Sequence, residues 1–301
     1  MKLLSHYIKN QTNRFSEITN WKSHNINDML YYSYRDTVYN KNTYPSNLHY
    51  HDYYELVIFE GGDIKYICES SIYSPKCGDV ILIPPGKFHM SIINGESTRY
   101  RRHVFYLFPS AFEKIGNGAL TEFLKKADEG YLFSFSSPKE KRFLNELTES
   151  LREIFDGNPS SLESALGLSR VINLFYLFNL ECFGLKNEST LLPDNVLLLQ
   201  RYIDENYSKI SSVTELAEKL SYSREYISRL FKKYFDTTVS DYIMKRRIAE
   251  SQLLLIKDYP IIDIAYQVGF GSLSSFIRSF RCVTNMTPSE YRKLSQKQFG
   301  S

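Results

Sequence analysis

The chain has 301 residues, of which 43% are apolar and 24% are charged. This apolar content excludes a globally disordered chain, and the length favours two domains over one. No apolar run reaches the about 20 residues of a membrane-spanning helix, and the N-terminus lacks the apolar stretch of a signal peptide. We therefore expect a cytoplasmic protein with no membrane partner.

The net charge of +3 is unevenly distributed along the chain. Residues 194–301 contain 16 Lys or Arg and 12 Asp or Glu, whereas residues 1–193 contain 21 and 22. The basic excess therefore lies entirely in the C-terminal third. Its size is compatible with nucleic-acid binding but too small to demonstrate it.

Residues from about 28 to 109 have the pattern of a β-rich domain. Short segments combine aromatic and β-branched residues, and Gly and Pro residues separate them. We expect strands at residues 30–34, 55–59, 64–68, 79–83 and 103–108. Several short strands joined by close turns indicate a sandwich or a small barrel.

One group of polar residues stands out within this domain. His49, His51, Tyr53 and Glu55 alternate along the chain, which places them on one face of a strand. A Gly-Pro-Gly-His stretch that ends at His89 follows. Together the two stretches resemble the two motifs of the cupin fold. That resemblance implies a cupin-like barrel in which His89 enters from a paired strand.

The chemistry of this group leaves three interpretations open. Imidazoles and a carboxylate can bind a small-molecule effector, can bind a divalent first-row metal ion, or can be purely structural. We favour an effector site made of His49, His51, Tyr53, Glu55 and His89, with no metal or other cofactor. The chain has 24 tyrosines, and phenol rings suit a sugar or an aromatic effector, although tyrosine also fills β-sheet surfaces.

Residues 112–184 have helical periodicity. Apolar residues recur at spacings of three and four in residues 139–155, and residues 162–180 are apolar around much of the helix circumference. The second helix should therefore be buried against the barrel or against a second subunit. The polar segment 185–193 predicts a linker, with an effector domain over residues 1–184 and a further domain over residues 194–301.

Two stretches of the C-terminal third each predict a short helix, a tight turn and a longer helix. In residues 213–235, Ala217 is small enough for two helices to approach, and Ser223 is placed to cap the longer helix. In residues 262–280, Ala265 repeats the small residue, and Ile262, Ile264 and Val268 join it on the expected inner face. Ser272 is placed to cap the longer helix. A helix-turn-helix pattern that occurs twice predicts a DNA-binding domain.

The segment between the two copies, residues 239–256, predicts a helix of about 27 Å. That length can hold two recognition helices near the about 34 Å spacing of successive major-groove turns. Three basic residues in its middle should be solvated or salt-bridged: Lys245, Arg246 and Arg247.

The pattern over residues 213–292 resembles the DNA-binding domain of the AraC family of bacterial transcription regulators. The similarity is closest in residues 264–270 and at the Thr287–Arg292 end. Asp236 and Asn285 replace the Gly that usually follows each recognition helix, but both residue types tolerate a left-handed cap.

The resemblance implies an effector bound in the cupin-like domain and a homodimer formed by helices within residues 139–184. It also implies a contact with RNA polymerase if the protein is an activator. Core packing within one chain is the competing interpretation of the same helices.

Exposed side chains near the N-terminus of each recognition helix are the candidates for DNA contact. In the first helix, Arg can hydrogen-bond to guanine and Glu can accept a hydrogen bond from cytosine. The lysines further along the helix are placed to contact the DNA phosphates. The second helix offers few hydrogen-bonding side chains, so we expect it to contribute position more than base reading. The candidates are Arg224, Glu225, Ser228, Arg229, Lys232, Lys233, Ser274, Ile277, Arg278 and Arg281.

The sequence thus predicts a two-domain α+β protein with an N-terminal cupin-like β-barrel, a helical dimerisation segment and a C-terminal all-α double helix-turn-helix. The predicted function is effector-controlled, sequence-specific binding of double-stranded promoter or operator DNA, without catalytic residues. The alternative is a metal-dependent cupin enzyme that uses His49, His51, Glu55 and His89. The duplicated helix-turn-helix counts against it, because an enzyme does not need that motif.

Overall fold

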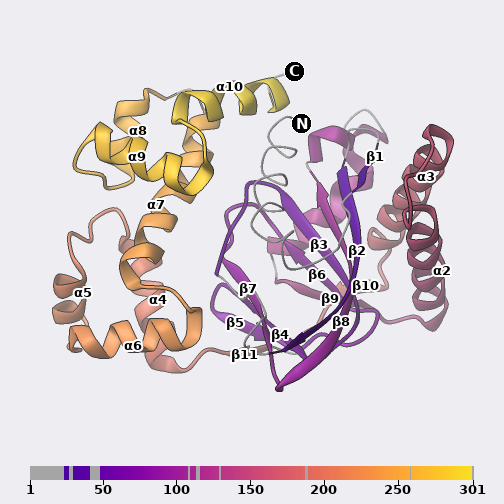
Figure 1. The fold of residues 1–301 in the computed structure, drawn as a ribbon, viewed down its shortest axis with the longest axis horizontal. Coiled ribbons are helices and arrows are strands. Elements are labelled where there is room, and N and C mark those ends of the chain that lie inside the picture. The colour runs from indigo at the N-terminus through magenta and orange to yellow at the C-terminus, as the bar shows by residue number, and fades with distance from the viewer. Residues whose placement is uncertain are drawn as a thin grey trace.

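The structure is a computed structural model that describes residues 24–26, 30–40, 48–107, 109–112, 116–128, 130–186, 189–257 and 259–299. An N-terminal β-rich domain carries two long helices on one side, and a helical C-terminal domain lies on the other (Figure 1). The predicted order, a cupin-like β domain followed by an all-helical double helix-turn-helix domain, is confirmed.

Two antiparallel sheets form the N-terminal domain. The larger has the order β1-β2-β8-β3-β6-β9-β10, and the smaller has the order β11-β5-β4-β7. The strands are β1 His24–Ile26, β2 Leu30–Asn40, β3 Tyr54–Gly61, β4 Ile64–Cys68, β5 Ser71–Tyr73, β6 Val80–Ile83, β7 His89–Ile93, β8 Ser97–Leu107, β9 Leu132–Phe135, β10 Phe183–Leu185 and β11 Ser189–Leu191. In the part of the chain that the structure describes, these are two separate sheets and not one closed barrel.

Side-chain alternation gives each sheet two apolar faces. The inner faces enclose a core rich in aromatic residues, which includes Tyr53, Phe59, Tyr66, Tyr100 and Tyr106. The outer face of the larger sheet packs against α2 (Pro138–Ile154), α3 (Ser161–Phe178) and the 3-10 helices η1 (Pro109–Phe112) and η2 (Gly116–Asp128). The two-layer sandwich is therefore covered by helices on one side only, within its own domain.

Two sequence expectations for this region need correction. Residues 112–184 are not continuously helical, because β9 and β10 lie within them and extend the larger sheet through β6. Part of the expected linker, Ser189–Leu191, is β11 and pairs with β5. The β-domain thus takes strands from well beyond residue 109.

The long helices α2 and α3 agree with their predicted positions. Ser160 begins α3 with a capping box, in which its side chain accepts from the Glu163 N–H and the Glu163 carboxylate accepts from the Ser160 N–H. The predicted burial of this helix holds for its C-terminal half only. Leu162 is 81% exposed and Leu166 is 44% exposed, so an apolar strip of α3 faces away from the sheet.

The C-terminal domain contains both predicted helix-turn-helix units. Its helices are α4 Asp194–Asn206, α5 Val213–Lys219, α6 Arg224–Phe235, α7 Val239–Ile256, α8 Ile261–Gln267, α9 Leu273–Thr284 and α10 Pro288–Phe299. The units are α5–α6 and α8–α9, and α7 joins them (Figure 1).

The predicted caps of the recognition helices are present. The hydroxyl of Ser223 accepts from the Tyr226 N–H, and that of Ser272 accepts from the Ser275 N–H. Asp236 and Asn285 both adopt the left-handed conformation, with φ of 49° and 58°. One assignment was wrong: Ile262 is 45% exposed, because Ile264 and Ala265 supply the buried face of α8.

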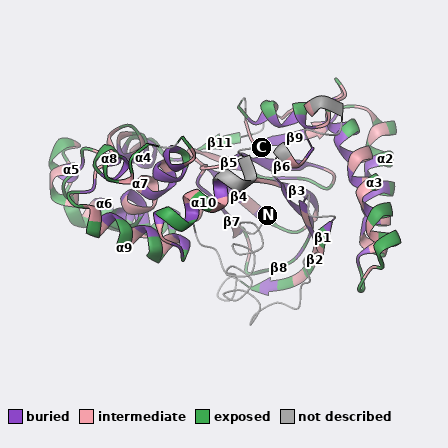
Figure 2. Cartoon of the chain, turned by 90° about the horizontal axis from the view of Figure 1, so that it is seen from above, coloured by how far each residue is buried: buried purple, intermediate pink, exposed green. Residues whose placement is uncertain are grey.

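The outer face of the smaller sheet packs directly on the C-terminal domain. Ile67, Phe88 and Met90 of the β-domain share one apolar cluster with Val196 of α4 and Tyr242 of α7. Figure 2 shows this junction as a region of buried and intermediate residues between β4, β7 and the helices. The helical domain therefore covers the sheet face that the effector domain leaves open.

Candidate functional site

The first recognition helix, α6, presents its predicted DNA-contact residues to solvent. The side of α6 that carries Ile227, Leu230 and Phe231 is buried. On the opposite side all six candidates are exposed: Arg224, Glu225, Ser228, Arg229, Lys232 and Lys233. Lys232 also forms an ion pair with Asp236, 2.6 Å away, just beyond the end of the helix.

The second recognition helix, α9, has a similar division of faces. Phe276 and Phe280 are buried, whereas Ser274, Ile277, Arg278 and Arg281 are exposed and line one shallow, open depression. Three further residues that the sequence reasoning missed complete this surface: Cys282, Asn285 and Thr287. Asn285 and Thr287 are small polar residues within three positions of the end of α9, which is the signal that could have identified them.

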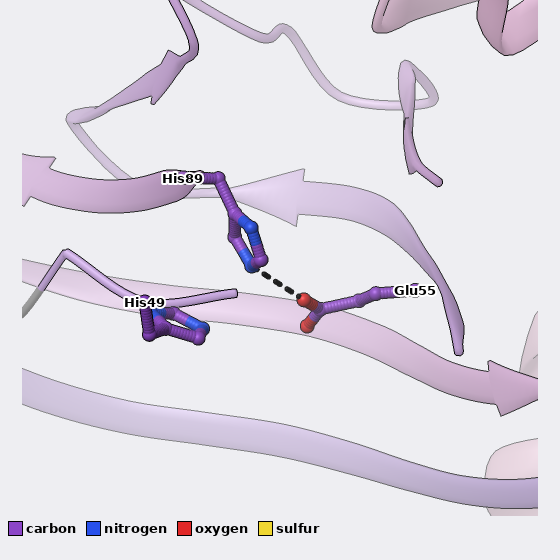
Figure 3. A group of neighbouring side chains, drawn as sticks. All are labelled: His49, Glu55 and His89. Atoms are coloured by element: carbon purple, nitrogen blue, oxygen red, sulfur yellow. Dashed lines mark hydrogen bonds and ion pairs between the residues drawn. The ribbon is translucent and has the colours of Figure 1, made fainter. Parts of the chain in front are cut away.

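The predicted effector-site residues converge at one end of the sandwich. Oε2 of Glu55 lies 3.1 Å from Nε2 of His51 and 3.0 Å from Nε2 of His89. The ring of His49 has its centroid 4.2 Å from that of His89. Figure 3 shows the His49 and His89 rings and the Glu55 carboxylate directed toward one another. We call His49, His51, Glu55 and His89 the histidine–glutamate cluster.

Backbone pairing brings these side chains together. The N–H of His49 donates to the carbonyl of His89 (3.0 Å), and the N–H of His89 donates to the carbonyl of His49 (2.9 Å). Nδ1 of His51 lies 2.8 Å from the Tyr53 carbonyl, and Nδ1 of His89 lies 3.0 Å from the Lys87 carbonyl. Each of these two rings is thus held in orientation by a backbone oxygen.

Tyr53 has a supporting position. Its ring stacks on that of His51, with centroids 4.1 Å apart and planes 8° apart, and it belongs to the aromatic core. The structure therefore brings four of the five predicted residues together as polar groups and places the fifth against them.

The electrostatics of the cluster follow from its burial. Burial lowers the pKa of His51, so this ring is neutral near pH 7. Burial acts to raise the pKa of Glu55, but hydrogen bonding to His51 and His89 outweighs it and holds that pKa well below its usual range. The cluster therefore presents an ionised carboxylate beside neutral imidazole nitrogen.

A second buried histidine group was missed by the sequence reasoning. His103 Nδ1 lies 2.8 Å from the Tyr32 hydroxyl, and its Nε2 lies 2.8 Å from Oε1 of Glu60. The Tyr34 hydroxyl also donates to Glu60 (3.1 Å). These residues come from three strands, so no local sequence motif identifies them. They lie on the outer face of the larger sheet, beside α2.

Polar contacts between the two domains were also missed. The Arg246 guanidinium lies 3.4 Å from Glu69 and 3.3 Å from Asp204. Burial raises the pKa of Asp204 to about 6. The Tyr291 hydroxyl donates to Asp52 across the junction, at 2.7 Å. Arg246 was expected only to be solvated or paired, and the sequence could not name a partner 177 positions away.

Comparison with known proteins agrees with this architecture. The family model of an AraC-like ligand binding domain matches residues 36–170, and that of a helix-turn-helix domain matches residues 216–294. The regulatory protein SoxS of Escherichia coli is 36% identical over 92 residues, which cover 86% of SoxS and 30% of this chain. The chain belongs to the AraC family of transcription regulators.

Other relatives of this AraC-family chain share less of its length or less identity. An uncharacterized HTH-type transcriptional regulator of Bacillus subtilis, YbfI, is 28% identical over 233 residues, which are 75% of this chain and 79% of YbfI. The melibiose operon regulatory protein of E. coli is 35% identical over 98 residues, about a third of each protein. Family membership identifies an effector-controlled, DNA-binding transcription regulator. Among the described helices, none is long and apolar enough to cross a membrane.

Proposed function

We propose that this AraC-family protein acts in the cytoplasm, binds a small effector at the histidine–glutamate cluster, and transmits that binding to its recognition helices through the domain junction. Base reading is assigned to Arg224, Glu225, Ser228 and Arg229 of α6, and the shallow depression along α9 positions the duplex. The single observation that carries the proposal is that the same backbone segments form the cluster and the junction.

The alternation of side chains along these segments supports the proposal. His49 and His51 face the cluster, whereas Leu48 and Tyr50 between and beside them pack in the apolar cluster shared with the C-terminal domain. On the paired segment, Phe88 packs on the C-terminal domain and His89 faces the cluster. Alternate residues of one segment thus contact the histidine–glutamate cluster on one side and the DNA-binding domain on the other.

Directed contacts reinforce this connection. Nζ of Lys245 in α7 donates to the Leu48 carbonyl (3.3 Å), and the Phe88 ring lies 5.0 Å from that of Tyr242. The guanidinium of Arg246 lies over Phe88, 5.4 Å from the ring centroid. A ligand that shifts His51 or His89 by even a fraction of an ångström changes the packing of Leu48 or Phe88 against α7, because packed interfaces do not deform continuously.

Homodimerisation through α3 is the second part of the proposal. The exposed apolar residues of α2 and α3 are Phe143, Leu162, Leu166 and Tyr176, and they lie on the side of the β-domain opposite to the DNA-binding domain (Figure 1). A second copy on this face would place two DNA-binding domains at the outer ends of one particle. An activator of this design would also contact RNA polymerase.

The boundaries that we propose are residues 1–184 for effector binding and dimerisation and residues 194–301 for DNA binding. The residues between them connect the two domains, and β11 within them ties that connection to the smaller sheet. Any displacement of this sheet is therefore passed to α4 through a short covalent path.

A ligand screen on the full-length protein tests the effector part. Sugars, aromatic acids and metal ions are screened for a raised melting temperature, since a ligand that binds the folded state stabilises it. Operator affinity is then measured with and without each hit. The proposal expects a ligand that stabilises the protein and also changes operator affinity, with both effects lost in Glu55→Ala. A ligand that binds at the cluster and leaves operator affinity unchanged would contradict it.

A further inference from the structure

The sequence favoured a metal-free effector site, but the geometry of the histidine–glutamate cluster points to a metal ligand. We propose that the ligand of this cluster is a divalent first-row transition-metal ion, which acts as the regulatory signal and not as a catalyst. The inference rests on the proposed function, because it names the ligand class of the same site. His49, Glu55 and His89 each offer one ligand atom, and these atoms all lie within 4.8 Å of one another. His51 adds a fourth nitrogen beside Glu55.

A count of protons within the cluster carries the argument. A neutral imidazole has one N–H. His51 directs its two nitrogens at two acceptor oxygens, the Tyr53 carbonyl (2.8 Å) and Glu55 Oε2 (3.1 Å). His89 does the same with the Lys87 carbonyl and the same Glu55 oxygen, at 3.0 Å each. In their neutral forms the two rings would therefore supply two protons for four contacts with acceptors.

A bound cation would remove the need for the missing protons. If each Nδ1–H donates to its backbone carbonyl, the Nε2 lone pairs and the carboxylate oxygen face one another and can share a metal ion. A histidine that binds a metal through one nitrogen and donates from the other to a carbonyl is the usual arrangement of such ligands. Protonating both rings instead would place two positive charges at a centroid separation of 4.8 Å, in a buried site with one carboxylate.

The second buried histidine group provides an internal contrast. His103 also has two polar partners, but one of them, the Tyr32 hydroxyl, is able to donate. Tyr32 can therefore donate to Nδ1 while Nε2–H donates to Glu60, so every contact has its proton. The shortage belongs to the histidine–glutamate cluster and is not a general property of buried histidines in this fold.

The spacing and types of the donors fit one class of metal. Ligand bonds of about 2.1 Å separate neighbouring donor atoms by about 3.0 Å at the right angles of an octahedral site and by about 3.4 Å in a tetrahedral site. The two Nε2 atoms lie 3.0 Å and 3.1 Å from Oε2 of Glu55. Imidazole with carboxylate suits zinc, iron, manganese, cobalt or nickel, whereas an all-oxygen site would suit magnesium or calcium.

The test uses the full-length protein without a polyhistidine tag, first treated with a chelator. Co²⁺ is titrated while visible absorption is recorded, and Zn²⁺ binding is measured by calorimetry. We expect one equivalent of either ion to bind. Glu55→Gln and His89→Gln should weaken binding by at least about 100-fold, because even outer partners of metal ligands are worth 10- to 100-fold. Glu60→Gln, in the group around His103, is the matched control and should bind as the wild type does.

Glu55→Gln also guards against a folding artefact. A glutamine amide can donate to Nε2 of His51 or His89, so the metal-free variant should melt at or above the temperature of metal-free wild type. The operator dissociation constant of wild type should change at least about fivefold when the metal is added, and that of Glu55→Gln should not change.

Several results would overturn the inference. They are the absence of saturable binding at one equivalent, binding that survives Glu55→Gln, or metal binding without any change in operator affinity. A response to an organic effector by a chain that binds no metal would overturn the metal assignment and leave the proposed function standing. Failure of the full-length protein to select promoter DNA would instead overturn the proposed function, whatever the metal titration gave.

Discussion

Arg229 is the residue at which base reading can be tested most sharply. It is exposed on α6, opposite the buried Ile227 and Leu230, so its replacement leaves the packing intact. We expect Arg229→Ala to cost about 1–3 kcal/mol on the cognate site and to relax preference at one base pair, if the guanidinium reads guanine. The measurement compares dissociation constants on cognate and scrambled duplexes.

Lys233 provides the comparison for that experiment. It is also exposed on α6, but we assign it to phosphate. Lys233→Ala should therefore weaken both duplexes alike and reduce the salt slope by about one unit. Equal weakening of the two duplexes by Arg229→Ala would show that Arg229 contacts phosphate as well.

Asp204 gives a pH-dependent prediction. Its pKa is raised by burial to about 6, above the ordinary value of 3.8. The folded state therefore holds this proton more tightly than the unfolded state. The resulting stabilisation is complete below about pH 4 and is lost as pH rises through about 6, and its size is at most about 3 kcal/mol. Urea unfolding of wild type and Asp204→Asn at pH 4 to 7 measures it. The two curves should differ in slope within this window, and parallel curves would contradict the assignment.

At the residue scale, sequence patterns located the exposed and the buried side chains of α6 and α9, because each is set by position on one amphipathic helix. Alternation placed His49, His51 and Glu55 on one face, and the cupin resemblance added His89. The expected strand begins only at Tyr54, because residues 48–53 lie outside the named strands and His49 pairs with His89 through an isolated bridge. The sequence reasoning missed Glu69 and Tyr291 as junction residues, since their partners lie in the other domain. It missed Asp204, since its partners Tyr242 and Arg246 lie on another helix. It misassigned Ile262, because Ile261 precedes it and Ile264 follows it within one short helix, and periodicity alone did not decide which of these isoleucines face inward.

At the scale of elements, the turn between α8 and α9 requires glycine at one position. Gly269 has φ of +96°, and a Cβ there would lie 2.7 Å from Cα of Ser208 and closer still to its carbonyl oxygen. We expect Gly269→Ala to destabilise the C-terminal domain by more than about 2 kcal/mol, because the strained conformation and the backbone clash add.

Gly271 is the matched control for this substitution. It lies two residues further along, and a Cβ there would meet no atom within 4 Å. Gly271→Ala should therefore change the thermal unfolding midpoint little. Similar losses in the two variants would indicate that the turn tolerates neither side chain and that the Ser208 contact is not decisive.

The elements themselves were predictable where the local pattern was strong. The connecting helix was expected over residues 239–256 and is found as Val239–Ile256. The strands β9, β10 and β11 were missed, because each has three or four residues and gains its stability from pairing with a distant strand. Residues 189–191 carry no apolar alternation, so only the β5 pairing makes them a strand.

At the scale of the whole molecule, the exposed apolar strip of α3 predicts self-association. Leu162→Asp combined with Leu166→Asp should weaken dimerisation by tenfold or more, since burying one leucine contributes roughly 1.5–3 kcal/mol. Sedimentation of the full-length chain at micromolar concentration measures this. Leu198→Asp, at an exposed leucine of α4, is the control and should leave association unchanged. A wild type that is strictly monomeric would contradict the proposed homodimer.

If the junction between the two domains controls DNA binding, loss of one hydroxyl at that junction should change operator affinity. Tyr291→Phe removes only the donor to Asp52 across the junction, and Tyr34→Phe removes a comparable hydroxyl–carboxylate bond to Glu60 on the far side of the sandwich. A net hydrogen bond to a charged group is worth about 1.5–3 kcal/mol. The measurement is the operator dissociation constant of the full-length variants. We predict a change of at least about threefold for Tyr291→Phe and none for Tyr34→Phe. Equal constants for both variants and wild type would contradict control through the junction.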